Sequence, residues 1–271
     1  MLFRSERVPL DISKIQRQVA NACRGIDGVS PSMIEIKAQI ELHDGISTKT
    51  LDELLLKAMV GLIDETENPE LNNVNYQYVA GRLKVSMLRK EVYGTYQPPK
   101  LYEIVKKNIE LGMYTPELLD WYTKEDWDII DLFIDHAKDE EYSYPAIAQL
   151  AEKYLVQNRA TGEIYETPQV RYAIAAATAF HAENKDVRLK YVKEYYECAS
   201  EGHFTLATPV LAGLGTQTKQ FSSCVLITSD DTLDSIFASG EMMAKYASKR
   251  AGIGFEIRSE EHTSELQSLR H

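Results

Sequence analysis

The chain has 271 residues, of which 44% are hydrophobic and 26% charged, a composition typical of a globular protein with a substantial core. At the usual size of about 100–200 residues per domain, this length predicts about two domains. The formal net charge of −11 argues against a protein whose main task is to grip a nucleic-acid backbone. Residues 1–95 carry 12 Lys and Arg against 13 Asp and Glu, and the remainder carries 18 against 28. The first third is therefore the more favourable region for an anionic small ligand.

Cysteine and histidine usage excludes further classes of site. The three cysteines, Cys23, Cys198 and Cys224, form no CxxC pair and no disulfide framework, which is typical of a reducing compartment. The six histidines have no spacing typical of metal ligands, so no metal site is predicted. The apolar runs are too short to span a bilayer, and the N-terminus lacks a signal-peptide pattern. We therefore expect a cytoplasmic protein without membrane contact.

Both ends of the sequence look foreign to the rest. Residues 258–268 read as one reading frame of a common sequencing-adapter oligonucleotide, and residues 2–5 match the end of the companion adapter. We expect residues 1–5 and 258–271 to be adapter-derived, and the natural segment to cover about 6–257 and to be cut at both ends. The adapter-like residues are excluded from the fold prediction.

Helical periodicity dominates the first 95 residues. Four helices are predicted, over 11–24, from Ser30 or Ser32 to about Ile40, from Thr50 to Ile63, and from Tyr76 to Gly94. Asp11 is the expected N-cap of the first helix, and a capping box at Thr50 opens the third. On the last helix, Arg89 and Lys90 are expected to point outward. Pro98-Pro99 then predicts a linker.

Residues 100–203 are predicted to be helical around one hairpin. Two short strands, 154–157 and 163–165, flank a turn that contains glycine. Thr167-Pro168 places an N-cap and a proline at the start of the next helix. A further helix is expected over 186–202, so the region as a whole predicts a helical domain.

The pattern changes after residue 203. A loop is predicted at 207–210 and an apolar strand over 221–228. A helix then begins at Asp231 or Thr232, with Asp231 as the favoured N-cap, and the glycines of 251–254 terminate it. A strand followed by a helix predicts the first piece of an α/β barrel or sheet.

From the residues alone, Cys224 is open to two interpretations, a buried structural thiol or a redox thiol. Ser222, Ser223 and Thr208 supply hydroxyls nearby, and a helix N-terminus follows, which suits anion binding. The sequence contains neither GxGxxG nor GxxxxGK[ST]. The residues therefore indicate an α/β enzyme fragment behind a helical module, with one candidate redox thiol.

Several motifs occur in the same order as in one known family. They are Asp44-Gly45-Ile46, Lys57-Ala58, Tyr76-Gln77-Tyr78, Leu88-Arg89-Lys90, Lys153 to Arg159, Thr161 to Glu166, Ala207 to Val210, Gln220 to Ile227 and Lys249 to Gly254. Together they resemble the large (alpha) subunit of class I ribonucleotide reductase, in the form found in enterobacteria and T-even-like phages. The resemblance covers residues 6–257.

The resemblance implies a mainly α fold with short β elements, in three parts. Residues 6–95 would form an ATP-cone regulatory domain that lacks its first strand, and residues 96–203 a helical N-terminal reductase domain. Residues 204–257 would be the truncated start of a ten-stranded α/β barrel. Members of the family reduce ribonucleoside diphosphates to 2′-deoxyribonucleoside diphosphates by radical chemistry, with electrons from a cysteine pair. By motif position, Cys224 would be one member of that redox-active pair.

The resemblance also implies three groups of site residues. The substrate-binding residues would be Thr208, Ser223, Cys224, Ala251 and Gly252. The allosteric specificity site, which reads a deoxynucleoside triphosphate, would comprise Asp231, Thr232, Leu233 and Lys249. The allosteric activity site for ATP or dATP would comprise Val8, Pro9, Leu10, Asp11, Ile12, Ser13, Lys14, Thr48 and Lys90. Asp52 and Met87 stand where histidines are expected in close relatives.

Effectors and partners follow from the same resemblance. It implies ATP or dATP and dNTPs as effectors, nucleoside diphosphates as substrates and no metal in this subunit. The implied partners are the small (beta) subunit, whose metal cofactor supplies the radical, a second large subunit in a homodimer, and thioredoxin or glutaredoxin. The compartment would be the cytoplasm of a bacterium or a phage-infected cell. We expect the truncated chain to be inactive alone and to bind ATP or dATP weakly or not at all.

Two other function classes remain open. ATP-cones also occur in transcription repressors, so the chain would then be a nucleotide-sensing module without catalysis. Residues 150–257 discriminate, because a repressor would carry zinc-ribbon cysteines and no strand around Cys224. A purely structural helical scaffold would leave Cys224 inert.

Overall fold

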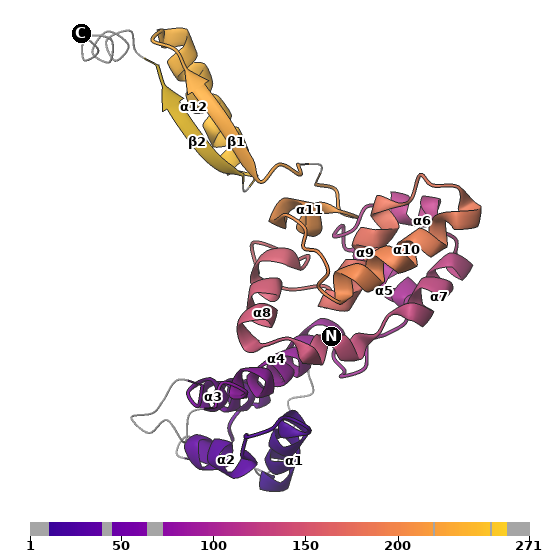
Figure 1. Ribbon diagram of the computed structural model, residues 1–271, viewed down its shortest axis with the longest axis vertical. Helices are drawn as coiled ribbons and strands as arrows, with labels where there is room; N and C mark the ends of the chain where they lie inside the picture. The colour runs from indigo at the N-terminus through magenta and orange to yellow at the C-terminus, as the bar shows by residue number, and fades with distance from the viewer. Residues whose placement is uncertain (1–10, 40–44, 64–72, 219, 250, 259–271) are drawn as a thin grey trace.

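The computed structural model describes residues 11–39, 45–63, 73–218, 220–249 and 251–258. They form an elongated molecule with a helical bundle at one end, a larger helical body in the middle and a strand–helix–strand unit at the other end (Figure 1). The sheet of the described residues has two strands. The predicted class, mainly α with short β elements, is confirmed.

The elements follow one another in three groups. The bundle contains α1 (Ile12–Cys23), α2 (Pro31–Gln39), α3 (Thr48–Val60) and α4 (Tyr76–Tyr93). The body contains α5 (Leu101–Glu110), α6 (Glu117–Trp121), α7 (Lys124–Phe133), the 3-10 helix η2 (His136–Glu141), α8 (Tyr144–Gln149), the π-helical turn η3 (Leu150–Tyr154), α9 (Pro168–Ala179), α10 (Lys185–Ser200) and α11 (Thr208–Gly213). The last unit contains β1 (Cys224–Ser229), α12 (Leu233–Ala247) and β2 (Gly252–Ile257).

Capping residues explain where the helices of the bundle begin and end. Asp11 caps α1 as predicted, because its carboxylate accepts a hydrogen bond from the Ser13 amide at 3.0 Å. The predicted N-cap of the third helix is wrong by three residues. Ser47 rather than Thr50 is the N-cap of α3, and its hydroxyl accepts from the Thr50 amide at 3.0 Å. Gly94 ends α4 as predicted, in a left-handed conformation with φ of 72°.

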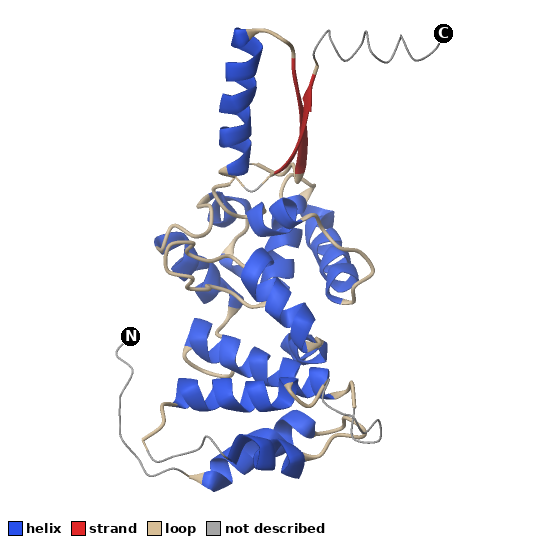
Figure 2. Ribbon diagram, turned by 90° about the vertical axis from the view of Figure 1, so that its left-hand side faces the viewer, coloured by secondary structure: helices blue, strands red, loops and turns tan. Residues whose placement is uncertain are grey.

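Helix α4 belongs to both the bundle and the body. Its first half contributes Tyr76, Val79 and Leu83 to the core of the bundle. Its second half packs against α8 and η3 in a separate hydrophobic cluster. That cluster consists of Val85, Leu88, Val92, Ile147, Ala151 and Leu155. One continuous helix therefore joins the two parts. Figure 2 shows the helical bundle, the helical body and the two strands in succession along the molecule.

The body packs around α9, which is buried along most of its length. The predicted hairpin is wrong in its strands, because Gln157 and Ile164 form only an isolated antiparallel bridge. Before the bridge, the Leu155 amide still donates within η3 to the Leu150 carbonyl. The next amide, that of Val156, donates to a side chain at 2.7 Å instead of to a partner strand. The antiparallel pairing here therefore consists of two backbone hydrogen bonds, from the Asn158 amide to the Glu163 carbonyl and from the Tyr165 amide to the Val156 carbonyl.

The strand–helix–strand unit contains a strand that the sequence did not reveal. β1 begins at Cys224, three residues later than predicted, and β2 lies parallel to it. The prediction that residues 251–254 terminate the preceding helix is wrong, because β2 begins at Gly252. The edge of β1 supplies the backbone hydrogen-bonding partners that make this glycine-rich segment a strand. The 207–210 segment, predicted as a loop, opens the short helix α11.

Candidate functional site

The predicted activity site lies in the bundle, where its described residues come from three helices. Val8, Pro9 and Leu10 lie outside the described residues. Asp11, Ile12, Ser13 and Lys14 form the start of α1, Thr48 is the first residue of α3, and Lys90 lies near the end of α4. Lys14 is mostly exposed, with its Nζ 3.8 Å from Asp11 Oδ2. A solvated surface pair of this kind contributes little to stability and leaves the ammonium accessible to an anion.

Lys90 is the predicted activity-site residue with the most defined surroundings. Its Nζ lies 3.2 Å from Asp52 Oδ2 on α3, and Asp52 Oδ1 accepts a hydrogen bond from Gln18 Nε2 at 2.7 Å. The carboxylate of Asp52 therefore connects α1, α3 and α4. No local pattern indicates this contact, because the partners lie 34 and 38 positions from Asp52 along the chain.

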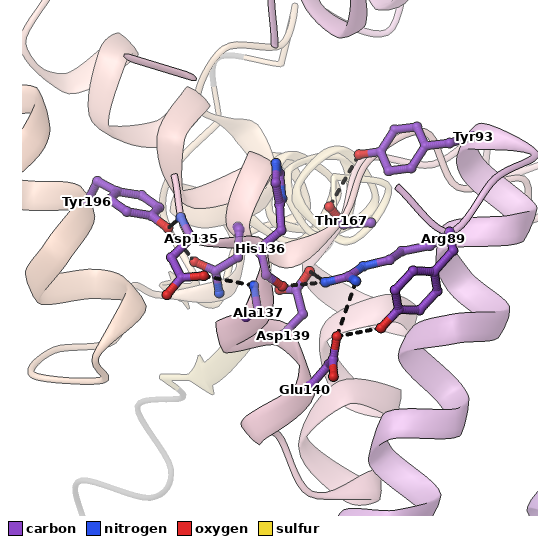
Figure 3. A network of polar contacts seen from close by, with 11 residues as sticks. Arg89, Tyr93, Asp135, His136, Ala137, Asp139, Glu140, Thr167 and Tyr196 are labelled. Atoms are coloured by element: carbon purple, nitrogen blue, oxygen red, sulfur yellow. Dashed lines mark hydrogen bonds and ion pairs between the residues drawn. The ribbon is translucent and has the colours of Figure 1, made fainter. Parts of the chain in front are cut away.

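Arg89, the neighbour of Lys90, is predicted to point outward, and the structure contradicts this. Its side chain is 3% exposed and faces the body, where η2 surrounds it with acceptors (Figure 3). Its Nη2 donates to the His136 carbonyl and lies 3.5 Å from Asp139 Oδ2. Its Nη1 lies 3.4 Å from Glu140 Oε1. Because successive residues of a helix point in directions about 100° apart, α4 presents Lys90 to the bundle and Arg89 to the body.

The electrostatics of this junction are unusual at Asp139. The side chain is fully buried, and neither of its carboxylate oxygens has a hydrogen-bond partner among the described residues. Burial raises the pKa of the Asp139 carboxyl to about 7, against the opposing effect of the Arg89 guanidinium. Burial also lowers the pKa of His136. The junction therefore contains a carboxyl group that changes charge near neutral pH.

Four of the five predicted substrate residues lie at one end of the two-stranded sheet. Cys224 and Gly252 are register partners at the first positions of the parallel strands. The Gly252 amide donates to the Ser223 carbonyl at 2.7 Å, and the Ser223 hydroxyl lies 3.9 Å from Cys224 Sγ. Ala251 directly precedes this pair. Among the described residues, no hydrogen bond joins Thr208 on α11 to this group.

Cys224 is exposed, so its interpretation as a buried structural cysteine is wrong. It stands at the end of the strand where few neighbouring atoms cover it. A side chain at position 252 would place its Cβ 3.9 Å from Cys224 Sγ, so glycine at this position keeps one side of the thiol open. An accessible thiol beside exposed backbone is suited to contact with a ligand.

The predicted specificity residues are divided between the two ends of α12. Thr232 rather than the predicted Asp231 is the N-cap, because its Oγ1 accepts from the Ser235 amide at 3.2 Å. Leu233 is the first residue of the helix and is largely exposed. Lys249 follows the other end of this 15-residue helix, about 22 Å along its axis at 1.5 Å per residue. The structure therefore groups three of these residues and separates Lys249 from them.

Other kinds of site find no support in the part of the chain that the structure describes. Within it, no cluster of three or more His, Cys, Asp or Glu side chains is arranged to hold a metal ion. Nor does any helix there have the length and apolar character needed to cross a membrane. All three cysteines are free thiols.

Two protein families match the chain. The ATP cone domain matches residues 4–91, and the ribonucleotide reductase all-alpha domain matches residues 140–219. The alpha subunit of ribonucleoside-diphosphate reductase from Haemophilus influenzae is 46% identical over 245 residues, which cover 90% of this chain and 32% of the relative. The alpha subunit of ribonucleoside-diphosphate reductase 1 from Escherichia coli is 45% identical over 250 residues, which cover 92% of this chain and 32% of the relative. The alpha subunit from Enterobacteria phage T4 is 37% identical over 264 residues, with 96% and 34% covered.

The similarity to these relatives extends over almost the whole chain, including the strand–helix–strand unit that neither family match covers. The chain spans about a third of the length of the curated relatives it matches. The bundle corresponds to the ATP cone match, and the body from α8 to α11 lies within the all-alpha match. The chain therefore belongs to the family of class I ribonucleotide reductase large subunits and matches their N-terminal region.

Proposed function

We propose that this chain is the nucleotide-sensing and substrate-binding front part of a reductase that converts ribonucleoside diphosphates to 2′-deoxyribonucleoside diphosphates. The observation that carries the proposal is the pairing of Cys224 with Gly252. It brings an exposed thiol, the Ser223 backbone and hydroxyl, and a glycine to one end of a parallel sheet. This group occurs in the same chain as an ATP cone domain and a reductase all-alpha domain.

The chemistry assigns one definite task to Cys224. Replacing the 2′-hydroxyl by hydrogen consumes two electrons and two protons, and the hydroxyl leaves as water. Two thiols supply both and become a disulfide. Cys224 would supply one thiol. Cys23 is buried in the bundle and Cys198 lies on α10, and neither is paired with Cys224, so a further cysteine of the large subunit must supply the other.

The remaining assignments follow the same proposal. The activity site of the bundle would bind ATP or dATP, with the ammonium of Lys90 exchanging Asp52 for phosphate oxygens. The N-terminus of α12, with Asp231, Thr232 and Leu233, would read a dNTP through its unpaired backbone amides. The partners would be the small subunit, a second large subunit, and thioredoxin or glutaredoxin to reduce the disulfide after each turnover.

The role of Cys224 is tested by substitution in a full-length large subunit that contains this segment. Cys224→Ser should abolish reduction of a ribonucleoside diphosphate, because the hydroxyl cannot form the disulfide, and should leave effector binding unchanged. Cys198→Ser is the matched control and should retain activity. Turnover by the Cys224→Ser subunit at the wild-type rate would refute the proposal.

The second candidate function is nucleotide sensing without catalysis, favoured by the contact of Lys90 with Asp52 in the bundle. It predicts tight, stoichiometric binding of ATP or dATP to this chain in calorimetry, lost in Lys90→Ala and kept in a Lys84→Ala control. It also predicts that Cys224→Ser has no effect on any activity of the full-length protein. The two candidates therefore differ in the outcome for Cys224.

A further inference from the structure

The segment between α11 and β1 carries the chain from the body to the thiol. It leaves α11 at Gly213 and reaches Cys224 through Phe221. Gly213 is buried, and a Cβ at this position would lie 3.0 Å from Cε1 of the Phe221 ring. The ring of Phe221, three residues before Cys224, therefore rests on the backbone of Gly213. The placement of the thiol depends on what holds this backbone.

A buried arginine holds the segment from the side of the body. The Arg171 side chain on α9 has no solvent exposure and forms an ion pair with Glu166, with Nη1 3.3 Å from Oε1. Its other terminal nitrogen, Nη2, donates to the carbonyl oxygen of Leu214. Glu166 is fixed in turn, since its carboxylate also accepts from the Val156 amide at 2.7 Å and from the Tyr114 hydroxyl.

Gly215, which follows Leu214, is also held in place by the body. The Gly215 carbonyl accepts a hydrogen bond from the Thr115 amide at 2.9 Å. Gly215 has φ of 73°, and a Cβ there would lie 2.5 Å from Ile174 Cγ2 and 3.0 Å from Thr178 Oγ1. Both the conformation and the space require glycine. Polar contacts and close packing thus hold Leu214 and Gly215 against α9 and against Thr115, which precedes α6.

Taken with the function proposed for the Cys224 site, we infer that Arg171 is a positioning residue for the substrate-binding group. Its guanidinium joins the fixed carboxylate of Glu166 to the Leu214 carbonyl, and the anchored backbone supports Phe221 and hence Ser223 and Cys224. An apolar side chain of the same length would fill the space, but it would remove the donor to the Leu214 carbonyl and the cationic partner of the buried Glu166 carboxylate. The planar guanidinium of arginine carries several N–H groups and can donate to the Glu166 carboxylate and the Leu214 carbonyl at the same time.

The inference is tested on the 271-residue chain by hydrogen exchange. Arg171→Met should speed exchange of the amides over 213–224 roughly tenfold, because a charged hydrogen bond to the Leu214 carbonyl is lost. Exchange over α4 and α7 should stay within a factor of about two of wild type, since the Arg171 contacts involve neither helix. Arg171→Lys, which keeps the charge and loses the planar guanidinium, should give an intermediate increase.

Arg188 provides the matched control. It is also a buried arginine in the body, with Nη2 3.4 Å from Asp126 Oδ2 and its guanidinium over the Tyr122 ring. Arg188→Met should speed exchange in α7 and α10 without a selective effect on 213–224. Unchanged exchange over 213–224 in Arg171→Met, or an equal increase throughout the body, would overturn the inference.

A second variant covers the case in which Arg171→Met does not fold. Gly215→Ala leaves Arg171 and Glu166 intact but places a methyl group against Ile174, so it should displace the same segment and speed exchange over 213–224 selectively. Wild-type exchange there would contradict the inference. These outcomes are independent of catalysis. An active Cys224→Ser enzyme would refute the proposed function and leave the exchange result standing.

Discussion

Among single residues, Asp139 has the clearest consequence for stability. Its folded-state pKa of about 7 lies above the ordinary value of 3.8, because burial penalises its charged form. Between these two values the folded chain binds more protons at this site than the unfolded chain does. Stability contributed by the protonated Asp139 is therefore present at low pH and is lost as the pH rises through about 7.

Asp139→Asn should remove that pH dependence. The amide has nearly the same shape and no charge to bury, so the difference in unfolding midpoint between variant and wild type should grow in favour of the variant from pH 5 to pH 8. Urea unfolding at several pH values measures this difference. The lowered pKa of His136 makes stability change with pH in the opposite direction, but His136 is present in both proteins and its effect cancels in the comparison. Glu140→Gln, which alters a half-exposed partner of Arg89, is the control. Parallel curves for Asp139→Asn and wild type would contradict the prediction.

At the scale of secondary-structure elements, the sequence predicted most where structure is local. The spacing of apolar residues and the signals at Asp11 and Gly94 correctly placed α1 and the end of α4. The predictions were wrong where a residue's secondary structure or burial depends on a partner far away in the sequence. β2 needs the edge of β1, and the buried position of Arg89 depends on η2, some 50 residues away. The grouping of Cys224 with Gly252 followed from motif resemblance and not from any local pattern.

The N-cap of α12 offers a sharp test at this scale. Thr232→Ala should destabilise the helix by about 1 kcal/mol, because the Ser235 amide loses its acceptor. Asp231→Ala, at the position that sequence reasoning favoured, should have a smaller effect, limited to the loss of a charge near the helix N-terminus. Hydrogen exchange over the first two turns of α12 measures both. A larger effect for Asp231→Ala would restore the original prediction of the N-cap.

At the scale of the whole molecule, the bundle and the body are held together by close packing as well as by polar contacts. Gly81 of α4 lies against the backbone of the segment before α8, where a Cβ would collide with the Tyr142 carbonyl oxygen. Arg89 joins η2 a little further along the same helix. The two parts therefore meet along more than two turns of α4.

Gly81→Ala should weaken this junction by about 1–3 kcal/mol, the usual effect of overpacking a close contact. Gly240→Ala is the matched control, because Gly240 also lies within a helix but nothing in the described residues lies within 4 Å of the point that a Cβ would occupy there. It should stabilise α12 by about 0.5–1 kcal/mol through the higher helix propensity of alanine. Thermal unfolding of the two variants compares them. Equal shifts in the same direction would show that α4 tolerates a side chain at position 81.

The shared helix α4 bears on how such a regulatory domain is gained or lost. Its second half carries Val85, Leu88 and Val92, which α8 and η3 cover. A bundle transplanted after Gly94 onto an unrelated protein would carry this apolar stripe uncovered, and a body deprived of α4 would expose the opposite face. Exchange of the domain between proteins therefore requires a recipient that already presents a counterpart of α8. We therefore expect the bundle to be transferred only together with the α8 and η3 surface that covers the second half of α4.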